Sequence, residues 1–320
     1  MNKKLILLVM TIFVLLQVNL FAERDKYAGE IFRMGAGVRN FSMGRVGLTD
    51  TKSPALAYWN ASLLLTLENR PFELMHAEEY KGLIKYDTFS GAFGENNNIG
   101  FTLSRIGDND NAMTRLPNPE LPPSDDNRPY KYKSVNNADY ILYLGFARMI
   151  GKVPLGLTPK IVYRTLAEIP AFGFGADLST HLQANEYFTF GVRIRDAIPT
   201  QIYWDNGTRE SVHTGIDLEM QIHTKMPVID TPLNLYFNGE INTEGMIRTS
   251  KANIGDVSLD PHLGAELILH PMVSLFAGYD IDNFTTGVGI NYSQFFLNYS
   301  FEQNSGLDNS HRFSIGYLFK

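Results

Sequence analysis

The side chains that could do chemistry in this sequence are acids, histidines and arginines that recur two or four residues apart. Side chains at that spacing share one face of an extended strand. Such a face could bind a metal, guide a solute or hold another segment of the chain. The candidates are Asp177, His181, Arg193, Arg195, Asp217, Glu219, His223, Glu240, His262, Glu266 and Asp280.

Catalysis and metal binding have little support in the sequence. It contains no Gly-x-Ser-x-Gly, His-Glu-x-x-His, P-loop or Gly-x-Gly-x-x-Gly pattern. Ser314 and His311 are three residues apart, so they lie on opposite faces of a strand and cannot form a hydrolase pair. His262 and Glu266 are a weak candidate metal site, and the chain has no cysteine. We therefore predict a protein that is not an enzyme, with no catalytic residue, no metal and no cofactor.

The composition favours β structure and excludes two classes of protein. With 28 Lys+Arg against 34 Asp+Glu, the chain has a formal charge of −6 and no basic cluster, so we predict no nucleic-acid partner. A hydrophobic fraction of 44% is too high for a disordered chain. The abundance of Phe (21), Tyr (16) and Gly (27) favours strands over helical bundles.

Residues 1–22 have the features of a secretory signal peptide. Lys3 and Lys4 precede an apolar run of about a dozen residues, and Ala22 marks the expected cleavage site. The alternative is an uncleaved anchor, but the run is shorter than the roughly 20 residues of a spanning helix. We predict an exported bacterial protein.

Beyond residue 69 the hydrophobic pattern alternates with a period of two, which predicts strands with one apolar and one polar face. Such strands occur in secreted β-sandwiches as well as in membrane barrels. The expected strands are 70–77, 83–93, 98–106, 137–149, 155–166, 172–183, 187–196, 212–224, 232–242, 261–270, 272–281, 284–293, 294–303 and 310–319.

The lengths of the connections favour the barrel. The long connections at 107–136, 197–211 and 243–260 all follow odd-numbered strands, and those after even-numbered strands are short. Long loops on one side and short turns on the other are typical of outer-membrane barrels with an even strand number. We therefore predict an all-β transmembrane barrel of about 14 antiparallel strands at 70–320, in the bacterial outer membrane and in contact with its lipid.

The connection at 107–136 is rich in oxygen ligands and proline. Asp108, Asp110, Asp125 and Asp126 could contribute to a Ca²⁺ site. A loop of this composition is more often a solvated cap, and the sequence leaves both possibilities open.

Residues 23–69 do not follow the strand pattern. Glycines at 35, 37, 44 and 47 permit close backbone packing. Ser53 followed by Pro54 predicts the start of a short helix that carries Leu56, Tyr58 and Trp59. Trp59 could plug a lumen or anchor the segment, and the sequence does not choose between them.

The segment contains Gly35-Ala-Gly-x-Arg-x-x-x-Met-Gly44, followed by Ser53-Pro-Ala-x-x-Tyr-Trp-Asn60. This pattern resembles the N-terminal signature of the PorV/PorQ family, within the FadL-like superfamily of outer-membrane barrels. The sequence differs from the family pattern at Asn60-Ala61-Ser62-Leu63-Leu64, where the family has Asn-Pro-Ala-Gly-Leu. It also differs at its end, where Lys320 follows Phe319 although a terminal aromatic is usual. The residues that carry the resemblance are Gly35, Gly37, Arg39, Met43, Gly44, Tyr58, Trp59 and Asn60.

The resemblance implies that residues 23–69 fold into the lumen as a hatch. It also implies one of two functions: passage of hydrophobic solutes such as fatty acids, or a part in protein secretion or surface attachment with secretion-machinery proteins as partners. We expect passage, with secretion as the alternative. A strand kink or bulge near Gly173–Gly175 or Gly287–Gly289, beside an apolar lumenal pocket, would favour passage. Broad extracellular loops without such a pocket would favour secretion. The eleven polar candidates would then guide a solute or hold the hatch, unless they are simply hydrated.

Overall fold

The computed structural model describes residues 28–94, 98–243, 250–255, 257–304, 306 and 308–320. The expected signal peptide and its cleavage site at Ala22 lie outside these residues, as does the part of the expected hatch at 23–27. Among the described residues, no helix has the length and apolar character needed to cross a membrane.

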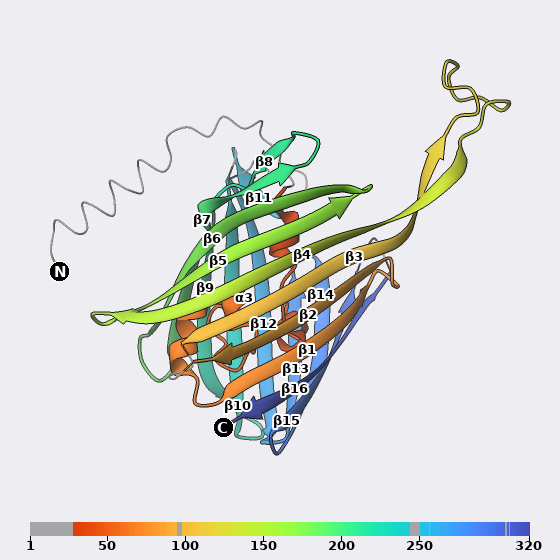
Figure 1. Ribbon diagram of the computed structural model, residues 1–320. Helices are drawn as coiled ribbons and strands as arrows, with labels where there is room; N and C mark the ends of the chain where they lie inside the picture. The colour runs from red at the N-terminus through yellow and green to blue at the C-terminus, as the bar shows by residue number, and fades with distance from the viewer. Residues whose placement is uncertain (1–27, 95–97, 244–249, 256, 305, 307) are drawn as a thin grey trace.

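Fourteen antiparallel strands form a closed barrel, which confirms the predicted fold class (Figure 1). The first and last strands close it, in register from Arg70 opposite Phe319 to Glu78 opposite His311. Two short strands, β8 (Arg209–Ser211) and β11 (Ala252–Ile254), are additions to the wall. The wall strands are β1 (Arg70–Glu79), β2 (Ile84–Phe93), β3 (Ile99–Arg115), β4 (Tyr130–Ile150), β5 (Val153–Leu166), β6 (Ile169–Gln183), β7 (Phe188–Trp204), β9 (Gly215–Met226), β10 (Thr231–Asn242), β12 (Val257–His270), β13 (Val273–Asp280), β14 (Asn283–Tyr292), β15 (Phe295–Gln303) and β16 (Ser310–Phe319).

The two ends of the barrel differ. The turn end, where β1 begins and β16 finishes, carries short turns such as 151–152 and 293–294. The opposite loop end carries the longer connections, among them 116–129 and 205–214. This sorting matches the one expected from the sequence.

The expected long loops are shorter than predicted, because the strands run on past the barrel. β3 continues to Arg115 and β4 begins at Tyr130, so most of 107–136 is a hairpin that projects from the loop end (Figure 1). The two strands pair with each other across irregularities at Asp108/Asn111 and Met113/Thr114. Residues in this hairpin do not need an apolar face, which is why the alternation used to find strands did not include them.

The outside of the wall is apolar. Leu103 is 43% exposed, Leu263 44% and Leu297 50%, and all three point away from the lumen. A β-sandwich would instead bury such residues between its two sheets. A continuous apolar outer band is stable against hydrocarbon, so this surface faces lipid.

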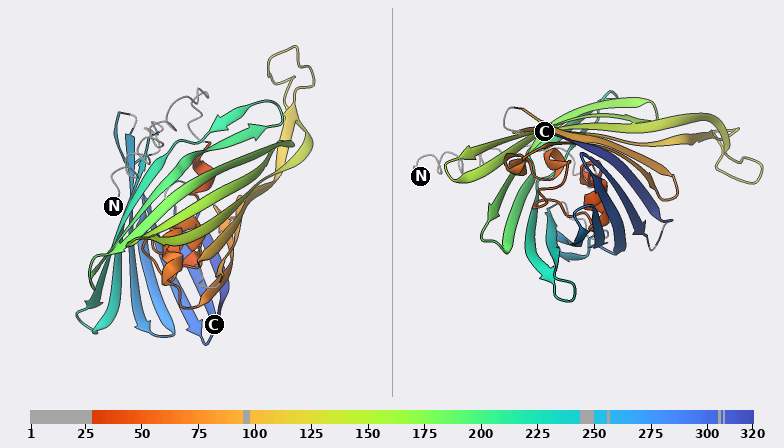
Figure 2. Two further views of the ribbon diagram at one scale, coloured as in Figure 1. Left: turned by 60° about the vertical axis from the view of Figure 1, so that its left-hand side comes forward. Right: turned by 90° about the horizontal axis from the view of Figure 1, so that it is seen from below.

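Residues 28–69, called the inner segment below, lie inside the barrel (Figure 2). Their elements are the 3-10 helices η1 (Glu30–Arg33) and η2 (Ala61–Thr66) and the α-helices α2 (Val38–Ser42) and α3 (Leu56–Trp59). Helix α2 packs on β13–β16, and α3 and η2 pack on β2–β6.

The helix predicted from Ser53 and Pro54 forms, but it begins later than expected. Helix α3 starts at Leu56 with Ala55 as its cap residue. The Ser53 hydroxyl donates to the Asn40 side chain (2.7 Å) and accepts from the Ala55 N–H (3.2 Å). Tertiary contact with Asn40 therefore takes the place of a helix cap.

Candidate functional site

The inner segment touches the wall where the inward positions are glycines. A Cβ on Gly278 would lie 2.2 Å from the Gly44 nitrogen, and one on Gly264 would lie 2.6 Å from the Met43 oxygen. Gly44 itself has φ +70°, a backbone conformation that favours glycine. The same close approach to the segment's backbone occurs at Gly156 and Gly191, and a Cβ on Gly287 would lie 2.2 Å from the Ser42 hydroxyl oxygen. Side-chain-free positions on five strands therefore let the segment lie directly against the wall.

Tyr58 and Trp59 fix the fold of the inner segment. The Tyr58 hydroxyl accepts from the Gly35 N–H and donates to the Phe32 carbonyl, both at 2.9 Å. The Trp59 indole N–H donates to the Ala36 carbonyl at 2.7 Å. Both rings are at least 97% buried. Of the two roles left open for Trp59, the contacts are those of an anchor.

Asn60 joins the inner segment to the wall. Its side-chain amide donates to the Leu48 carbonyl (2.7 Å) and to the Thr180 carbonyl on β6 (3.2 Å). Its side-chain oxygen accepts from the N–H and hydroxyl of Ser62. The Ser62 hydroxyl in turn lies 2.8 Å from a ring nitrogen of His181.

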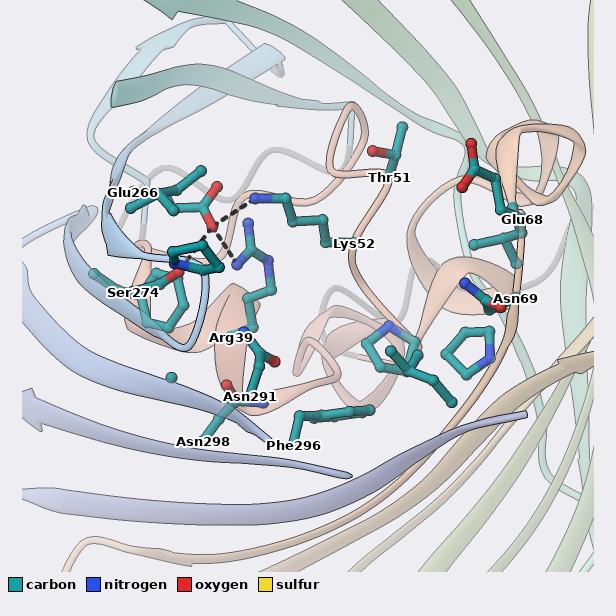
Figure 3. Close-up of a pocket in the computed structure, with 18 of the residues that line it drawn as sticks. Arg39, Thr51, Lys52, Glu68, Asn69, Glu266, Ser274, Asn291, Phe296 and Asn298 are labelled. Carbon is teal, nitrogen blue, oxygen red and sulfur yellow. Dashed lines mark hydrogen bonds and ion pairs between the residues drawn. The ribbon is translucent and has the colours of Figure 1, made fainter. Parts of the chain in front are cut away.

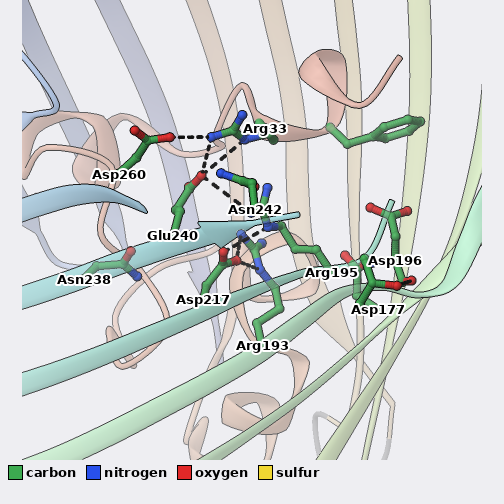
Figure 4. A network of polar contacts seen from close by, with 12 residues as sticks. Arg33, Asp177, Arg193, Arg195, Asp196, Asp217, Asn238, Glu240, Asn242 and Asp260 are labelled. Atoms are coloured by element: carbon green, nitrogen blue, oxygen red, sulfur yellow. Dashed lines mark hydrogen bonds and ion pairs between the residues drawn. The ribbon is translucent and has the colours of Figure 1, made fainter. Parts of the chain in front are cut away.

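A buried charge network links the inner segment to β7, β9, β10 and β12 (Figure 4). Arg33 of the segment lies 3.0 Å from Glu240 and 3.2 Å from Asp260. Arg193 and Arg195 pair with the two oxygens of Asp217 at 2.7 and 2.9 Å. Because every one of these groups is largely buried, each charge depends on its partner.

The other predicted lumenal residues also contact the inner segment or one another. Glu219 accepts from the backbone N–H groups of Gly47 and Thr49, both at 2.9 Å. His262 lies 2.9 Å from Asp280, which also pairs with Arg45 of the segment at 3.4 Å. His223 bonds to Thr189 and Asn234 of neighbouring strands. All eleven candidates therefore face the lumen, and most are buried and paired rather than hydrated.

Arg39 is the central cation at the turn end. It pairs with Asp50 at 2.7 Å and with Glu266 at 2.8 Å, and Lys52 reaches the same Glu266 at 3.0 Å. Burial alone would lower the pKa of the Arg39 guanidinium, but the carboxylates of Asp50 and Glu266 outweigh that effect and raise it well above its ordinary value. Arg39 therefore stays charged at any pH at which the protein is folded.

Lys160 marks an irregular place in the wall. It is buried between Asp177 (2.8 Å) and Asp196 (2.6 Å), where the β6–β7 register shifts twice between Phe174 and Leu178. The Asp196 N–H donates to the Asp177 carboxylate at 2.7 Å instead of to a strand carbonyl. This break lies beside Gly173–Gly175, whereas β14 pairs regularly with both of its neighbours at Gly287–Gly289.

A cavity lies against the inner segment at each end of the barrel. The turn-end cavity, of about 530 Å³, lies between the segment and β12–β16 and contains Arg39, Lys52 and Glu266 in its lining (Figure 3). The loop-end cavity, of about 210 Å³, is lined by charged residues that include Arg33, Arg45 and Arg312. A path along the lumen would have to displace the packed segment between them.

Sequence reasoning missed several charged residues of the lumen: Arg33, Arg45, Lys160, Asp196 and Arg312. Lys160 carried a signal, since it shares the inward face of β5 with Gly156, Thr158 and Val162. Arg33 and Arg45 carried none, because they lie in irregular backbone. Their partners are up to 235 residues away in the chain.

The weaker sequence candidates for chemistry are placed as follows. Ser314 faces inward and is buried, whereas His311 faces outward and contacts Tyr299, so they lie on opposite faces of β16. Asp108 accepts from Asn111 and Asn137, and Asp110 pairs with Lys131. Within the described residues, no group of three or more His, Asp or Glu side chains is arranged to hold a metal ion.

Known protein families and curated sequences give no match to this chain. Solved structures, however, do match the chain. The Ralstonia pickettii toluene transporter TbuX aligns with a TM-score of 0.53 and 10% identity over 89% of this chain and 98% of its own. The Pseudomonas putida toluene transporter TodX gives 0.50 and 10% over 89% and 96%, and the CymD monoaromatic hydrocarbon channel gives 0.50 and 10% over 89% and 97%.

The chain shares the fold of these transporters. At 10% identity the likeness concerns the barrel architecture and not the residues inside it. The chemistry of this lumen has therefore to be inferred from its own side chains.

Proposed function

We propose that the protein is a bacterial outer-membrane barrel through which hydrophobic solutes such as fatty acids pass, with residues 23–69 as its hatch. The PorV/PorQ-like signature of the inner segment belongs to this proposal, and so does the role of the polar lumenal residues in holding the hatch. The barrel fold shared with toluene transporters and the apolar outer band support it.

The observation that carries the proposal is the break in the β6–β7 ladder. A hydrophobic solute that leaves the lumen for the membrane has to pass between two strands. At Ala176 three residues of β7 bulge out of register, and the Asp177 side chain replaces a backbone acceptor. Fewer backbone bonds have to part here than in a regular ladder. The kink expected near Gly173–Gly175 is present, beside the charged Lys160 cluster instead of an apolar pocket.

The test is uptake of labelled oleate and toluene by cells that lack their own transporters and express this protein. The sharpest variant is Leu178→Cys with Ile194→Cys, which are paired residues at the edge of the break and lie on the outward side of the wall. The natural chain has no cysteine, so oxidation forms a single defined clamp. We expect uptake above the empty-vector level, loss of uptake on oxidation, and recovery with reductant.

Two results would count against this proposal. Uptake of neither solute above the empty vector would contradict passage. Uptake that persists in the fully oxidised clamp would show that the solute does not leave through the β6–β7 break.

Protein secretion or surface attachment is the second candidate. The projecting β3–β4 hairpin offers a contact surface outside the barrel, and the packed lumen leaves little room for a solute (Figure 1). Deleting the gene in its host distinguishes the two. Surface proteins that accumulate in the periplasm, with solute uptake unchanged, would favour secretion.

A further inference from the structure

The turn-end cavity is accessible from one end of the barrel. Thr66, Glu68 and Asn69 form an exposed rim, and the lining also includes the buried rings of Phe276 and Phe296 on the inner wall. A volume of about 530 Å³ is sufficient for a chain of about ten carbons or more.

The charges around this cavity are already balanced. Arg39 binds Asp50 through two nitrogens, at 2.7 and 3.2 Å, and reaches Glu266 with a third at 2.8 Å. The remaining cation, Lys52, binds Glu266 at 3.0 Å. Two cations therefore face two carboxylates, and Glu68 at the rim adds a third negative group. A carboxylate that entered would meet these acids without an uncommitted cation to receive it.

The rest of the lining is uncharged and consists of a polar group of residues and an apolar group. Carboxamide and hydroxyl groups of Asn291, Asn298 and Ser274 lie near one another on β13–β15 (Figure 3). Apolar groups complete the lining: Pro54, Leu67, Pro71, Ile268, Pro271, Phe276, Phe296 and Leu318. The Asn298 amide already donates to Ser314 at 3.3 Å and to Glu73 at 3.5 Å, which leaves its side-chain oxygen and the Asn291 carboxamide for a ligand. Carboxamides both donate and accept, so this pair suits a hydroxyl, ester or amide.

We propose that the turn-end cavity binds neutral amphiphiles, with the hydrocarbon chain against Phe276 and Phe296 and an uncharged hydroxyl, ester or amide at Asn291 and Asn298. This inference rests on the proposed passage of hydrophobic solutes. It specifies which class of these solutes binds in the turn-end cavity. Ionised fatty acids bind it more weakly than the matching alcohols.

The test compares two probes that differ in one group, 11-bromoundecanol and 11-bromoundecanoate, at about pH 8, where the carboxylate is ionised. Leu318→Trp places a fluorescent reporter in the cavity lining, and bromine quenches it on contact. The protein is held in nanodiscs, and the same protein without the substitution gives the background from Trp59 and Trp204. We expect saturable quenching by the alcohol at a concentration about 10-fold lower than by the carboxylate.

Two further variants locate the polar contact. Asn291→Ala should weaken alcohol binding about 3- to 10-fold, as expected for one lost hydrogen bond. Asn206→Ala makes the same change in an exposed turn at the loop end, away from the cavity, and is the matched control that should leave alcohol binding within about 2-fold.

Three outcomes would overturn the inference. One is tighter binding of the carboxylate, lost in Lys52→Ala, which would make the cavity a site for acids. Another is unchanged alcohol binding in Asn291→Ala. The third is the absence of saturable quenching by either probe. None of these results depends on the uptake assay, so the proposed passage of solutes is tested independently.

Discussion

Arg39 of the inner segment and Glu266 of β12 form a 2.8 Å ion pair although 227 residues separate them in the chain. Glu266 also accepts from Lys52 and from Asn234 of β10, at 3.0 and 2.8 Å. One buried carboxylate therefore joins two points of the inner segment to two strands of the wall.

Replacing this carboxylate should loosen the segment and the wall together. We expect Glu266→Gln to lower the free energy of unfolding by about 3–5 kcal/mol, because it leaves Arg39 partly unpaired in a buried site. Unfolding in urea, followed by the gel mobility of the folded barrel, measures the change. Glu68→Gln at the exposed rim is the control and should have little effect. Equal stability of the two variants would contradict a structural role for Glu266.

A side chain at the glycine contacts should push the inner segment away from the wall. Gly278→Val places a Cβ about where the Gly44 nitrogen lies, so we expect a loss of about 1–3 kcal/mol and a rise in ion conductance across a lipid bilayer. The neighbouring Ala277→Val faces lipid on the same strand and should change neither quantity. Conductance that stays at the wild-type level in Gly278→Val would show that the segment tolerates the added side chain.

Lys160 should stabilise the barrel at the irregular β6–β7 pairing. Lys160→Met leaves Asp177 and Asp196 without their cation, and we expect it to lower the unfolding temperature clearly, at a cost of about 3–5 kcal/mol. Adding Asp177→Asn and Asp196→Asn to the same chain removes the unpaired charges and should restore part of the lost stability. If the triple variant were less stable than Lys160→Met, charge repulsion would not be the cause.

Movement of the inner segment can be tested with a reversible lock. A Cβ on Gly145 of β4 would lie 3.1 Å from the Cβ of Ala57 on α3, so a disulfide, which needs about 3.5–4.5 Å, requires α3 to shift by a few tenths of an ångström. If the segment moves during passage, Ala57→Cys with Gly145→Cys should lose solute uptake on oxidation and regain it with reductant. The single variants Ala57→Cys and Gly145→Cys, treated in the same way, control for the oxidant and for the side chain added at Gly145. Full uptake by the oxidised double variant would mean that α3 stays in place.

Much of the wall could be predicted from the sequence. Inward and outward residues alternate strictly on strands such as β9, so Ile216 and Leu218 marked the lipid side while Asp217 and Glu219 marked the lumen. The extended strands around Arg115 and Tyr130 were missed because the hairpin outside the membrane needs no apolar face. The start of α3 was misplaced because Ser53 bonds to Asn40, a contact that local pattern does not reveal.

The sequence by itself determined the closed barrel, because a period of two and the sorting of loop lengths are local properties. They can be recognised without knowing which residues contact one another. The sequence also showed which polar side chains turn inward. Only the tertiary structure decided which charges neutralise which, since Arg33, Arg39 and Arg45 each pair with a carboxylate of the wall more than 200 residues away. The balance of charge in the lumen, and with it the chemistry that each cavity accepts, follows from those long-range pairs.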